Sequence, residues 1–411
     1  MKKKPSLAVW IFLGMILGIG VGFLFQGNPA FAINYIKPFG TIFLNLIKMV
    51  VVPVVLTSIM SGVMSMKDIR KVGSVGVKTV LYYLCTTACA VTLGLVIANL
   101  LHVGGGYMIA STADLAYEAQ SAPSFMDTLV NIFPSNFFEP LASATMLQVI
   151  VIALMFGFGV ILAGEKGRPV AEFIDSATEV CMKVMGMIIK LSPIGVFALL
   201  VPVIAENGID VLLPLIRLIG VAYLVYLVHM VVVYSATTRL FAKLSPVKFF
   251  SGMAPAIAMA FSSASSVGAL PLNLECTQKL GAKKEIASFV LPLGATINMD
   301  GTAIYQGVCA VFIASVFGAD LSLSQQLTII LTATLASIGT AGVPGSGMIM
   351  LSMVLQSAGL PIEGIALVAG IDRILDMGRT TVNITGDAAC TVCISAIESR
   401  RELLRKIRRA D

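Results

Sequence analysis

Residues 249–272 read FFSGMAPAIAMAFSSASSVGALPL, an apolar stretch with a serine-rich centre. The loops on either side of it carry five lysines: Lys243, Lys248, Lys279, Lys283 and Lys284. Loops rich in lysine and arginine stay on the cytoplasmic side of a membrane. A membrane crossing would place one of the two loops outside, so we predict that the stretch enters and leaves by the cytoplasmic face as a re-entrant helical hairpin.

The composition of the whole chain indicates a membrane protein. Of its 411 residues, 57% are hydrophobic and 12% are charged, whereas soluble domains average about 45–50% apolar and about 25% charged residues. Several stretches exceed the roughly 18–20 apolar residues that cross a hydrocarbon core of about 30 Å. We therefore predict an all-α polytopic membrane protein with eight transmembrane helices, at residues 6–26, 35–64, 76–101, 127–164, 176–205, 212–240, 285–316 and 364–396.

The charged loops predict the orientation of the chain in the cell membrane. The N-terminal lysines and the basic tail, residues 397–411, place both termini in the cytoplasm. A second apolar stretch, residues 325–362, has only Asp320 before it and Glu363 after it, which places both of its ends outside. Irregular backbone at membrane depth is tolerated only where protein or water surrounds it, so two opposed re-entrant hairpins predict a central site between inverted repeats.

Three short segments interrupt the apolar sequence where this site is expected. The tips of the two hairpins, residues 262–268 and 337–347, are rich in small and polar residues, which let backbone amides and carbonyls approach a ligand closely. Between the hairpins, residues 298–302 (NMDGT) place an acid and a glycine inside an apolar span, which predicts local unwinding. Unwound carbonyls together with Asp300 and Asn298 are hard oxygen ligands suited to an alkali cation.

The last predicted span carries a stripe of polar and charged residues. At about 100° per residue, six residues share a helix face about 100° wide: Asp372, Asp376, Arg379, Thr380, Asn383 and Asp387. An ionised side chain at mid-membrane costs roughly 2.5–3.5 kcal/mol on insertion scales, so such residues usually mark function. Arg379 suits a carboxylate and Asp376 suits an ammonium, one turn away, as an amino-acid zwitterion requires.

The charge balance of this region predicts cation coupling. Asp300, Asp376 and Asp387 against Arg379 leave the site at −2, and a bound acidic amino acid makes it −3. About three cations restore neutrality, or fewer if a carboxylate is protonated.

The same features are also compatible with other interpretations. Small residues at the hairpin tips also allow close helix packing, and an Arg/Asp network can serve only to hold helices together. No enzyme is predicted, because His102 and His229 are expected to lie far from the stripe and no nucleophile with a base emerges. The seven cysteines suggest neither a disulfide framework nor a zinc site. An anion channel is the alternative from a different class, and no cofactor or nucleic acid is expected.

The motifs as a set resemble those of the dicarboxylate/amino acid:cation symporter family, the glutamate transporter family. The resemblance runs from the first span to the end of the eighth. Five segments carry it, in the family's order: residues 46–53 (LIKMVVVP), the serine-rich tip, residues 298–302, residues 339–347 (GTAGVPGSG) and residues 376–383 (DMGRTTVN).

The resemblance implies a homotrimer that works as an elevator, with a transport domain moving against a scaffold. The scaffold would comprise residues 1–75 and 102–207, the latter including an external loop. The transport domain would comprise residues 76–101 and 208–396, and residues 397–411 would form the cytoplasmic tail. Sodium would be the coupling ion and aspartate or glutamate the substrate.

The same resemblance, carried over residue by residue, implies a substrate site and three sodium sites. Asp376 would hold the substrate's amino group, Arg379 its side-chain carboxylate, and Asn383 with Ser266 its α-carboxylate. The substrate residues are Ser265, Ser266, Thr302, Gly342, Val343, Gly347, Asp376, Arg379, Thr380 and Asn383. The sodium sets are Gly294, Asn298, Asn383 and Asp387; Thr296, Met299, Ser337, Ile338 and Thr340; and Tyr83, Thr86, Thr87, Asn298 and Asp300. Asp387 favours sodium, because proton-coupled relatives tend to carry a neutral residue there.

Two departures from the family pattern concern the substrate. The arginine that archaeal members have beside the serine-rich tip is Ala264 here, and the alternative arginine after Asp376 is Met377. Arg373, one turn before Asp376, is the candidate to supply that charge. Neutral amino acids, C4-dicarboxylates and proton coupling therefore stay as alternatives to sodium-coupled transport of acidic amino acids.

Overall fold

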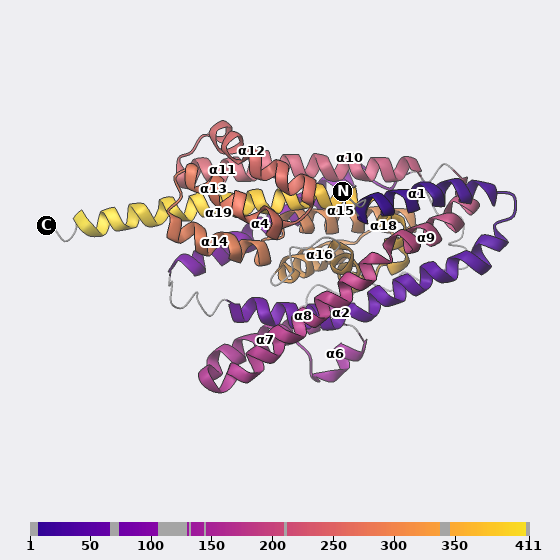
Figure 1. The fold of residues 1–411 in the computed structure, drawn as a ribbon, viewed down its shortest axis with the longest axis horizontal. Coiled ribbons are helices and arrows are strands. Elements are labelled where there is room, and N and C mark those ends of the chain that lie inside the picture. The colour runs from indigo at the N-terminus through magenta and orange to yellow at the C-terminus, as the bar shows by residue number, and fades with distance from the viewer. Residues whose placement is uncertain are drawn as a thin grey trace, which may run out of the picture.

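The computed structural model describes residues 7–65, 74–105, 130, 133–143, 145–208, 212–337 and 346–407, and within these ranges the chain is helical and has no β-strand (Figure 1). The predicted all-α class is confirmed for this part of the chain. Four helical segments in it are long and apolar enough to cross a membrane: Val75–Leu100, Gln148–Ile188, Leu212–Ala242 and Lys284–Val316. Shorter apolar helices accompany them, and the number of eight spans stays a prediction.

The first half of the chain forms mostly long apolar helices. They are α1 (Leu7–Leu24), the π-helix η1 (Ala32–Ile36), α2 (Lys37–Ser65), α4 (Ser74–Leu100), α6 (Phe138–Ser143), α7 (Met146–Ala163), the 3-10 helix η3 (Gly164–Gly167), α8 (Arg168–Lys190) and α9 (Ser192–Asn207). The span predicted at 176–205 differs: the helix already begins at Arg168, and it breaks at Leu191. Pro193 explains the break, because it lacks the N–H that a continuous helix needs and is tolerated in the first turn of a new one.

The second half begins with α10 (Leu212–Val228), which continues through the π-helix η5 (His229–Tyr234), α11 (Ser235–Thr237) and the π-helix η6 (Thr238–Ala242). Two helix pairs and one interrupted helix follow: α12 (Pro246–Ser263) with α13 (Ser266–Lys279), α14 (Lys284–Ile297) with α15 (Asp300–Val316), and α16 (Leu323–Ala336) with α17 (Ser346–Ser357). The chain ends with the 3-10 helix η7 (Ile362–Gly364), α18 (Ile365–Ala369) and α19 (Asp372–Ile407).

The pair α12–α13 corresponds to the first predicted hairpin. The chain turns at Ala264, whose φ of 49° lies in the left-handed region, and Ser265 caps α13 with its side chain. The pair is longer than the predicted stretch of 249–272, because Lys248 and Lys279 lie inside the helices rather than in flanking loops. The second predicted hairpin corresponds to α16 and α17, and its tip at 338–345 lies outside the described residues.

The interruption predicted at residues 298–302 is present between α14 and α15. Asn298 has an extended backbone (φ −85°, ψ 103°), and Met299 is also non-helical (φ −124°, ψ 41°). The unwound joint is shorter than the motif, since Asp300 already begins α15.

Helix α19 runs well past the predicted end of the last span at residue 396. Glutamate and arginine are good helix formers, so the helix continues after the apolar sequence stops. Its far end is also held in place: Glu398 forms an ion pair with Lys78 of α4, and Ser395 Oγ accepts a hydrogen bond of 2.9 Å from Lys283 N.

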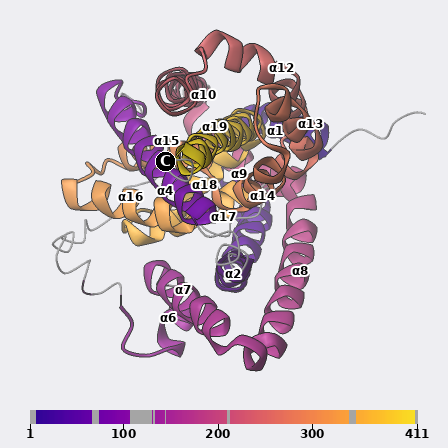
Figure 2. The same ribbon diagram turned by 90° about the vertical axis from the view of Figure 1, so that its left-hand side faces the viewer.

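Packing divides the helices into two groups. Helices α1, α2, α7, α8 and α9 pack mainly on one another, whereas α4, α10, α12, α13, α14, α16 and α17 pack around α15 and α19. Figure 2 shows α2, α7 and α8 in the lower part of the view, below α10, α12 and α19. Helix α15 is apolar on nearly all sides and is buried along its length, as expected for such a helix. The two groups contact each other where α17 packs on α2 and α7 and where α18 packs on α9. One of these contacts is an apolar cluster of Val196, Leu200, Met348 and Ala369.

Candidate functional site

The charged face of α19 is buried, and its side chains pair with one another. Arg379 Nε donates to Asp376 Oδ1 at 2.8 Å, and its terminal nitrogens donate to the two oxygens of Asp372 at 3.0 and 3.5 Å. All three residues are at most 5% exposed. Spacings of three, four and seven residues bring the side chains to one helix face. The sequence places Asp372 on the stripe but predicts no role for it. In the structure it is a principal partner of Arg379.

Two residues from other helices confine the guanidinium of Arg379. Its central carbon lies 4.7 Å from the ring centroid of Tyr305 on α15, which is a cation–π contact. Gly347, near the start of α17, lies so close that an added Cβ would overlap the guanidinium. The structure therefore places Gly347 next to Arg379, as the site prediction expected, and adds Tyr305, which the sequence did not single out.

Arg373 connects α19 to the tip of the α12–α13 pair. Its Nη2 donates to Ser263 O at 3.2 Å, and its Nη1 lies 3.7 Å from Asp376 Oδ2. Ser263 is the last residue of α12, where carbonyls lack a partner within the helix. The guanidinium thus lies beside Ala264, at the tip where the family pattern has an arginine.

The unwound joint between α14 and α15 is held against α19. Asn298 Nδ2 donates to Asn383 O at 2.8 Å and to Asp387 Oδ1 at 2.9 Å. The side chain of Asn383 reaches the start of α15, with Gly301 N at 2.8 Å, Met299 Sδ at 3.4 Å and Thr302 Oγ1 at 3.4 Å. Five residues predicted to bind substrate or sodium therefore lie together at this joint: Asn298, Met299, Thr302, Asn383 and Asp387.

The joint offers oxygen atoms to a cation. Asn298 Oδ1 is buried and has no hydrogen-bond partner in the part of the chain that the structure describes. Gly294, one turn earlier on α14, lies against the Asp387 carboxylate and the Tyr83 hydroxyl, since an added Cβ would overlap both. An amide oxygen, a carboxylate and a phenol oxygen are hard donors, so these residues fit an alkali cation.

Asp300 lies at a second polar cluster, formed by four side chains. Thr87 Oγ1 and Thr86 Oγ1 donate to Oδ1 at 2.7 and 3.3 Å, Tyr234 OH donates to Oδ2 at 2.8 Å, and His229 Nε2 lies 3.2 Å from Oδ2. His229 and Tyr234 belong to the π-helix η5, a distortion often found at functional sites. His229 is expected far from the stripe of α19, and its contact is instead with Asp300, which is not on that stripe. The contact arises because α10, which continues into η5, packs on α15.

The remaining predicted positions are described only in part. Ser266 is buried at the start of α13, and Thr380 Oγ1 lies 3.5 Å from Asp376 Oδ1. Ser337 Oγ donates to Thr334 O at 2.7 Å, at the end of α16. Ile338, Thr340, Gly342 and Val343 lie outside the described residues, as does the side chain of Thr296.

The formal charges of the buried acids and arginines described above sum to −2, as in the sequence count, with different contributors. Asp372 and Asp376 contact the guanidiniums of Arg373 and Arg379, whereas Asp300 and Asp387 accept hydrogen bonds from uncharged side chains. The sequence count omitted Asp372 and Arg373, whose charges cancel.

The chain matches a known family over almost its whole length. The model of the sodium:dicarboxylate symporter family matches residues 7–397. The chain is 40% identical over 406 residues to the proton/sodium-glutamate symport protein of Bacillus caldotenax, covering 97% of this chain and 96% of the relative. It is 34% identical over 411 residues to the proton/glutamate-aspartate symporter of Escherichia coli strain K12, covering 97% of this chain and 94% of the relative.

A third relative is named for a different substrate. The C4-dicarboxylate transport protein 1 of Ralstonia nicotianae is 35% identical over 412 residues, which cover 98% of this chain and 94% of the relative. The family match and these identities agree with the motifs of the hairpins, the joint and α19. This chain therefore belongs to the sodium:dicarboxylate symporter family.

Proposed function

We propose that this protein is a secondary transporter that couples the uptake of acidic amino acids, aspartate or glutamate, to sodium. The observation that carries the proposal is the pair of Asp376 and Arg379 on the buried face of α19, one turn apart. Arg379 offers five N–H donors, of which the described contacts with Asp372 and Asp376 use three. It can thus bind a carboxylate while Asp376 binds the ammonium group.

The relatives' names leave the substrate open, since they include glutamate, aspartate and C4-dicarboxylates. All of these substrates carry two carboxylates, and only the amino acids also carry an ammonium group. A second acid beside Arg379 repels a dicarboxylate unless a cation lies between them. Asp376 therefore favours an amino acid over a C4-dicarboxylate.

The joint between α14 and α15 supports sodium as the coupling ion. It combines the Asp387 carboxylate, the Tyr83 hydroxyl and Asn298 Oδ1, which has no hydrogen-bond partner among the described residues. The net charge of −2 and the added charge of an acidic substrate favour the binding of several cations together with it. The names of two relatives also include the proton, so the pH dependence of transport has to be measured beside its sodium dependence.

We also propose the elevator arrangement, with eight spans, two re-entrant hairpins and cytoplasmic termini. The packing supports it, because the helices of the proposed scaffold and of the proposed transport domain form the two groups described above. Their apolar contact at Val196, Leu200, Met348 and Ala369 is free of ion pairs among the described residues, as suits a surface that slides. A homotrimer is proposed from the family resemblance.

Uptake into proteoliposomes tests the proposed function. Labelled aspartate, glutamate, serine and succinate are offered with and without an inward sodium gradient, and at several pH values. We expect saturable accumulation of aspartate and glutamate against their gradients only with sodium. Uptake of succinate without aspartate would indicate a C4-dicarboxylate carrier, uptake of serine alone a neutral amino-acid carrier, and equilibration without accumulation a channel.

Replacing Asp387 by asparagine should weaken sodium binding and, through it, substrate binding. Asp387 lies eleven residues beyond Asp376, about 16 Å along the helix, so its effect on aspartate has to act through the cation. Coupling between the two ligands is reciprocal: if sodium raises aspartate affinity by some factor, aspartate raises sodium affinity by the same factor. Titration of the purified protein with aspartate at several sodium concentrations should show a steep dependence in the wild type and a shallow one in Asp387→Asn.

Glu398→Gln is the matched control for that experiment, since it removes a carboxylate from the same helix, where it pairs with Lys78 away from the joint and from Arg379. Its sodium dependence should stay steep. A wild-type affinity that ignores sodium and follows pH would make the protein a proton symporter and would remove the sodium assignment.

Replacing Gly294 by alanine tests the same site without changing any charge. The added methyl group would overlap Asp387 Oδ1 and Tyr83 OH, and such overpacking costs about 1–3 kcal/mol. The sodium concentration for half-maximal uptake should therefore rise roughly 5- to 150-fold. Gly220→Ala on α10, where an added Cβ meets open space, should leave it unchanged, and equal effects of the two variants would argue against a cation at Gly294.

A further inference from the structure

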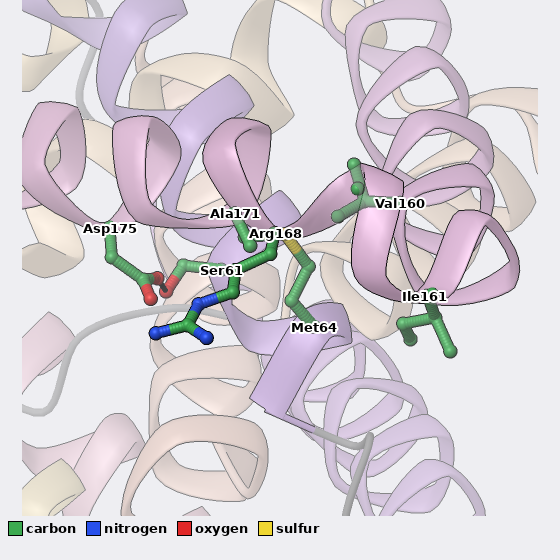
Figure 3. Close-up of a pocket in the computed structure, with 9 residues that line it drawn as sticks. Ser61, Met64, Val160, Ile161, Arg168, Ala171 and Asp175 are labelled. Atoms are coloured by element: carbon green, nitrogen blue, oxygen red, sulfur yellow. Dashed lines mark hydrogen bonds between the residues drawn. The ribbon is translucent and has the colours of Figure 1, made fainter.

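A cavity of about 330 Å³ lies where α2, α7 and α8 come together. It is lined by the last turns of α2 and α7, the short helix η3 and the first turns of α8, and none of its lining belongs to α19 (Figure 3). The cavity is therefore separate from the charged cluster of the candidate transport site.

The two sides of the cavity differ in character. Figure 3 shows Ser61, Arg168 and Asp175 on one side and Met64, Val160 and Ile161 on the other. A ligand that fills it has to combine a polar part carrying both charge signs with an apolar part.

The charged side of the cavity is formed mainly by one face of α8. Arg168, Ala171 and Asp175 are spaced by three and four residues, so they share one face of the helix. The small side chain of Ala171 leaves room between a cationic and an anionic group. Ser61 Oγ on α2 donates to Asp175 Oδ1 at 2.6 Å, which fixes the orientation of that carboxylate. Arg168 Nε donates a hydrogen bond to Glu172 Oε1 at 2.9 Å, and its guanidinium has four further N–H donors.

The surroundings of the cavity are those of a lipid-facing surface. Leu162 on α7 and Phe173 on α8 are each 69% exposed, and Val170 is 47% exposed. Neighbouring apolar side chains that are exposed to this extent mark contact with a membrane or with another protein surface. The inference rests here on the proposed topology, in which the connection from α7 to α8 lies at the cytoplasmic surface, where acyl chains meet headgroups.

We propose that this cavity binds the headgroup of an aminophospholipid, of the phosphatidylethanolamine type. The phosphate lies at Arg168, which suits it in charge and in donor geometry. The primary ammonium lies at Asp175, and the start of the acyl chains lies along Met64, Val160 and Ile161. A free phosphate or a purely anionic lipid is disfavoured by Asp175, and a simple cation is disfavoured by Arg168. A choline headgroup has no N–H to donate to Asp175.

Native mass spectrometry of the delipidated, purified full chain tests this proposal. The probes are dioleoyl phosphatidylethanolamine, phosphatidylcholine and phosphatidylglycerol, titrated separately. We expect the wild type to bind phosphatidylethanolamine roughly fivefold more tightly than phosphatidylcholine, on the scale of a single exposed charged contact. Phosphatidylglycerol should bind more weakly than phosphatidylethanolamine.

Three variants assign the contacts. Asp175→Asn should abolish the preference for phosphatidylethanolamine over phosphatidylcholine, and Arg168→Gln should weaken the binding of both. Glu179→Gln is the matched control, because it removes the same charge from the same helix one turn beyond Asp175 and does not line the cavity. Sodium-dependent aspartate binding in each variant shows that the protein is folded.

Several outcomes would overturn the proposal. Equal binding of phosphatidylethanolamine and phosphatidylcholine by the wild type would do so, as would an equal loss of preference in Glu179→Gln. Preferential binding of phosphatidylglycerol that depends on Arg168 alone would make the cavity an anionic-lipid site. Dissociation of oligomers in Asp175→Asn, without any change in lipid binding, would indicate that a second copy of the chain covers it.

Discussion

Replacing Arg379 by alanine is expected to reduce the affinity for aspartate roughly 30- to 5,000-fold, the equivalent of the 2–5 kcal/mol that removing one partner of a buried charge pair costs. Arg379 is the buried cation of the α19 face, and Tyr305 and Gly347 confine its guanidinium. A neutral amino acid such as serine needs no side-chain counter-charge and should lose much less. Competition of labelled aspartate by unlabelled aspartate and serine measures both effects.

The single variant also removes the guanidinium that pairs with Asp372 and Asp376, which threatens folding, although Arg373 still lies 3.7 Å from Asp376. The double variant Asp372→Asn with Arg379→Ala also removes the negative charge of Asp372. It should recover the thermal stability lost in the single variant and still fail to bind aspartate tightly. Aspartate affinity at the wild-type level in the stable double variant would show that Arg379 only holds helices together.

Replacing Asp376 by asparagine is expected to weaken aspartate binding on a similar scale, about 2–5 kcal/mol. The physical reason is the loss of the carboxylate that pairs with the substrate's ammonium. Arg379 keeps its contacts with Asp372 in this variant, so the carboxylate-binding part of the site should persist. Succinate, which has no amino group, should therefore bind the variant no more weakly than the wild type.

The comparison of the two ligands makes the result decisive. If aspartate and succinate lose affinity equally, Asp376 positions Arg379 rather than binding an ammonium group. If neither loses affinity, the amine is recognised at another residue.

The sequence predicted the parts of the site that follow from helix periodicity. The stripe from Asp372 to Asp387 needs only the 100° rotation per residue, and the break at Asn298 needs only the poor helix preference of its neighbours. Both are present in the structure. The roles predicted for the two hairpin tips stay predictions, since residues such as Thr340 and Val343 lie outside the described part.

The site residues that could not be predicted from the sequence come from helices other than α19. Tyr305 lies under Arg379, and His229 and Tyr234 reach Asp300, through tertiary packing that no local pattern encodes. The π-helical turns of the α10 segment also alter its periodicity, so a regular helical wheel gives the wrong face there. One signal was available: His229 is a polar residue inside an apolar span, a position that usually marks function.

The helix ends were predicted less well than the helices themselves. The charge pattern predicts loops at charged residues, whereas Lys248, Lys279 and Glu398 all lie within helices. A charged residue marks where a segment leaves the hydrocarbon core, but the backbone hydrogen bonds of the helix can continue past it. Hydropathy therefore predicts the membrane boundary and not the end of the helix.

The length of α19 suggests how the carrier's position can be observed. Its 36 residues correspond to about 54 Å of unbroken helix, well beyond a hydrocarbon core of about 30 Å. The ion pair of Lys78 with Glu398 and the contact of Lys283 with Ser395 join the far part of this rod to α4 and α14. A displacement of Asp376 and Arg379, as the proposed elevator requires, would thus be transmitted to the opposite end. In the proposed topology, a spectroscopic label near residue 407 would report it from outside the bilayer without disturbing the proposed substrate residues.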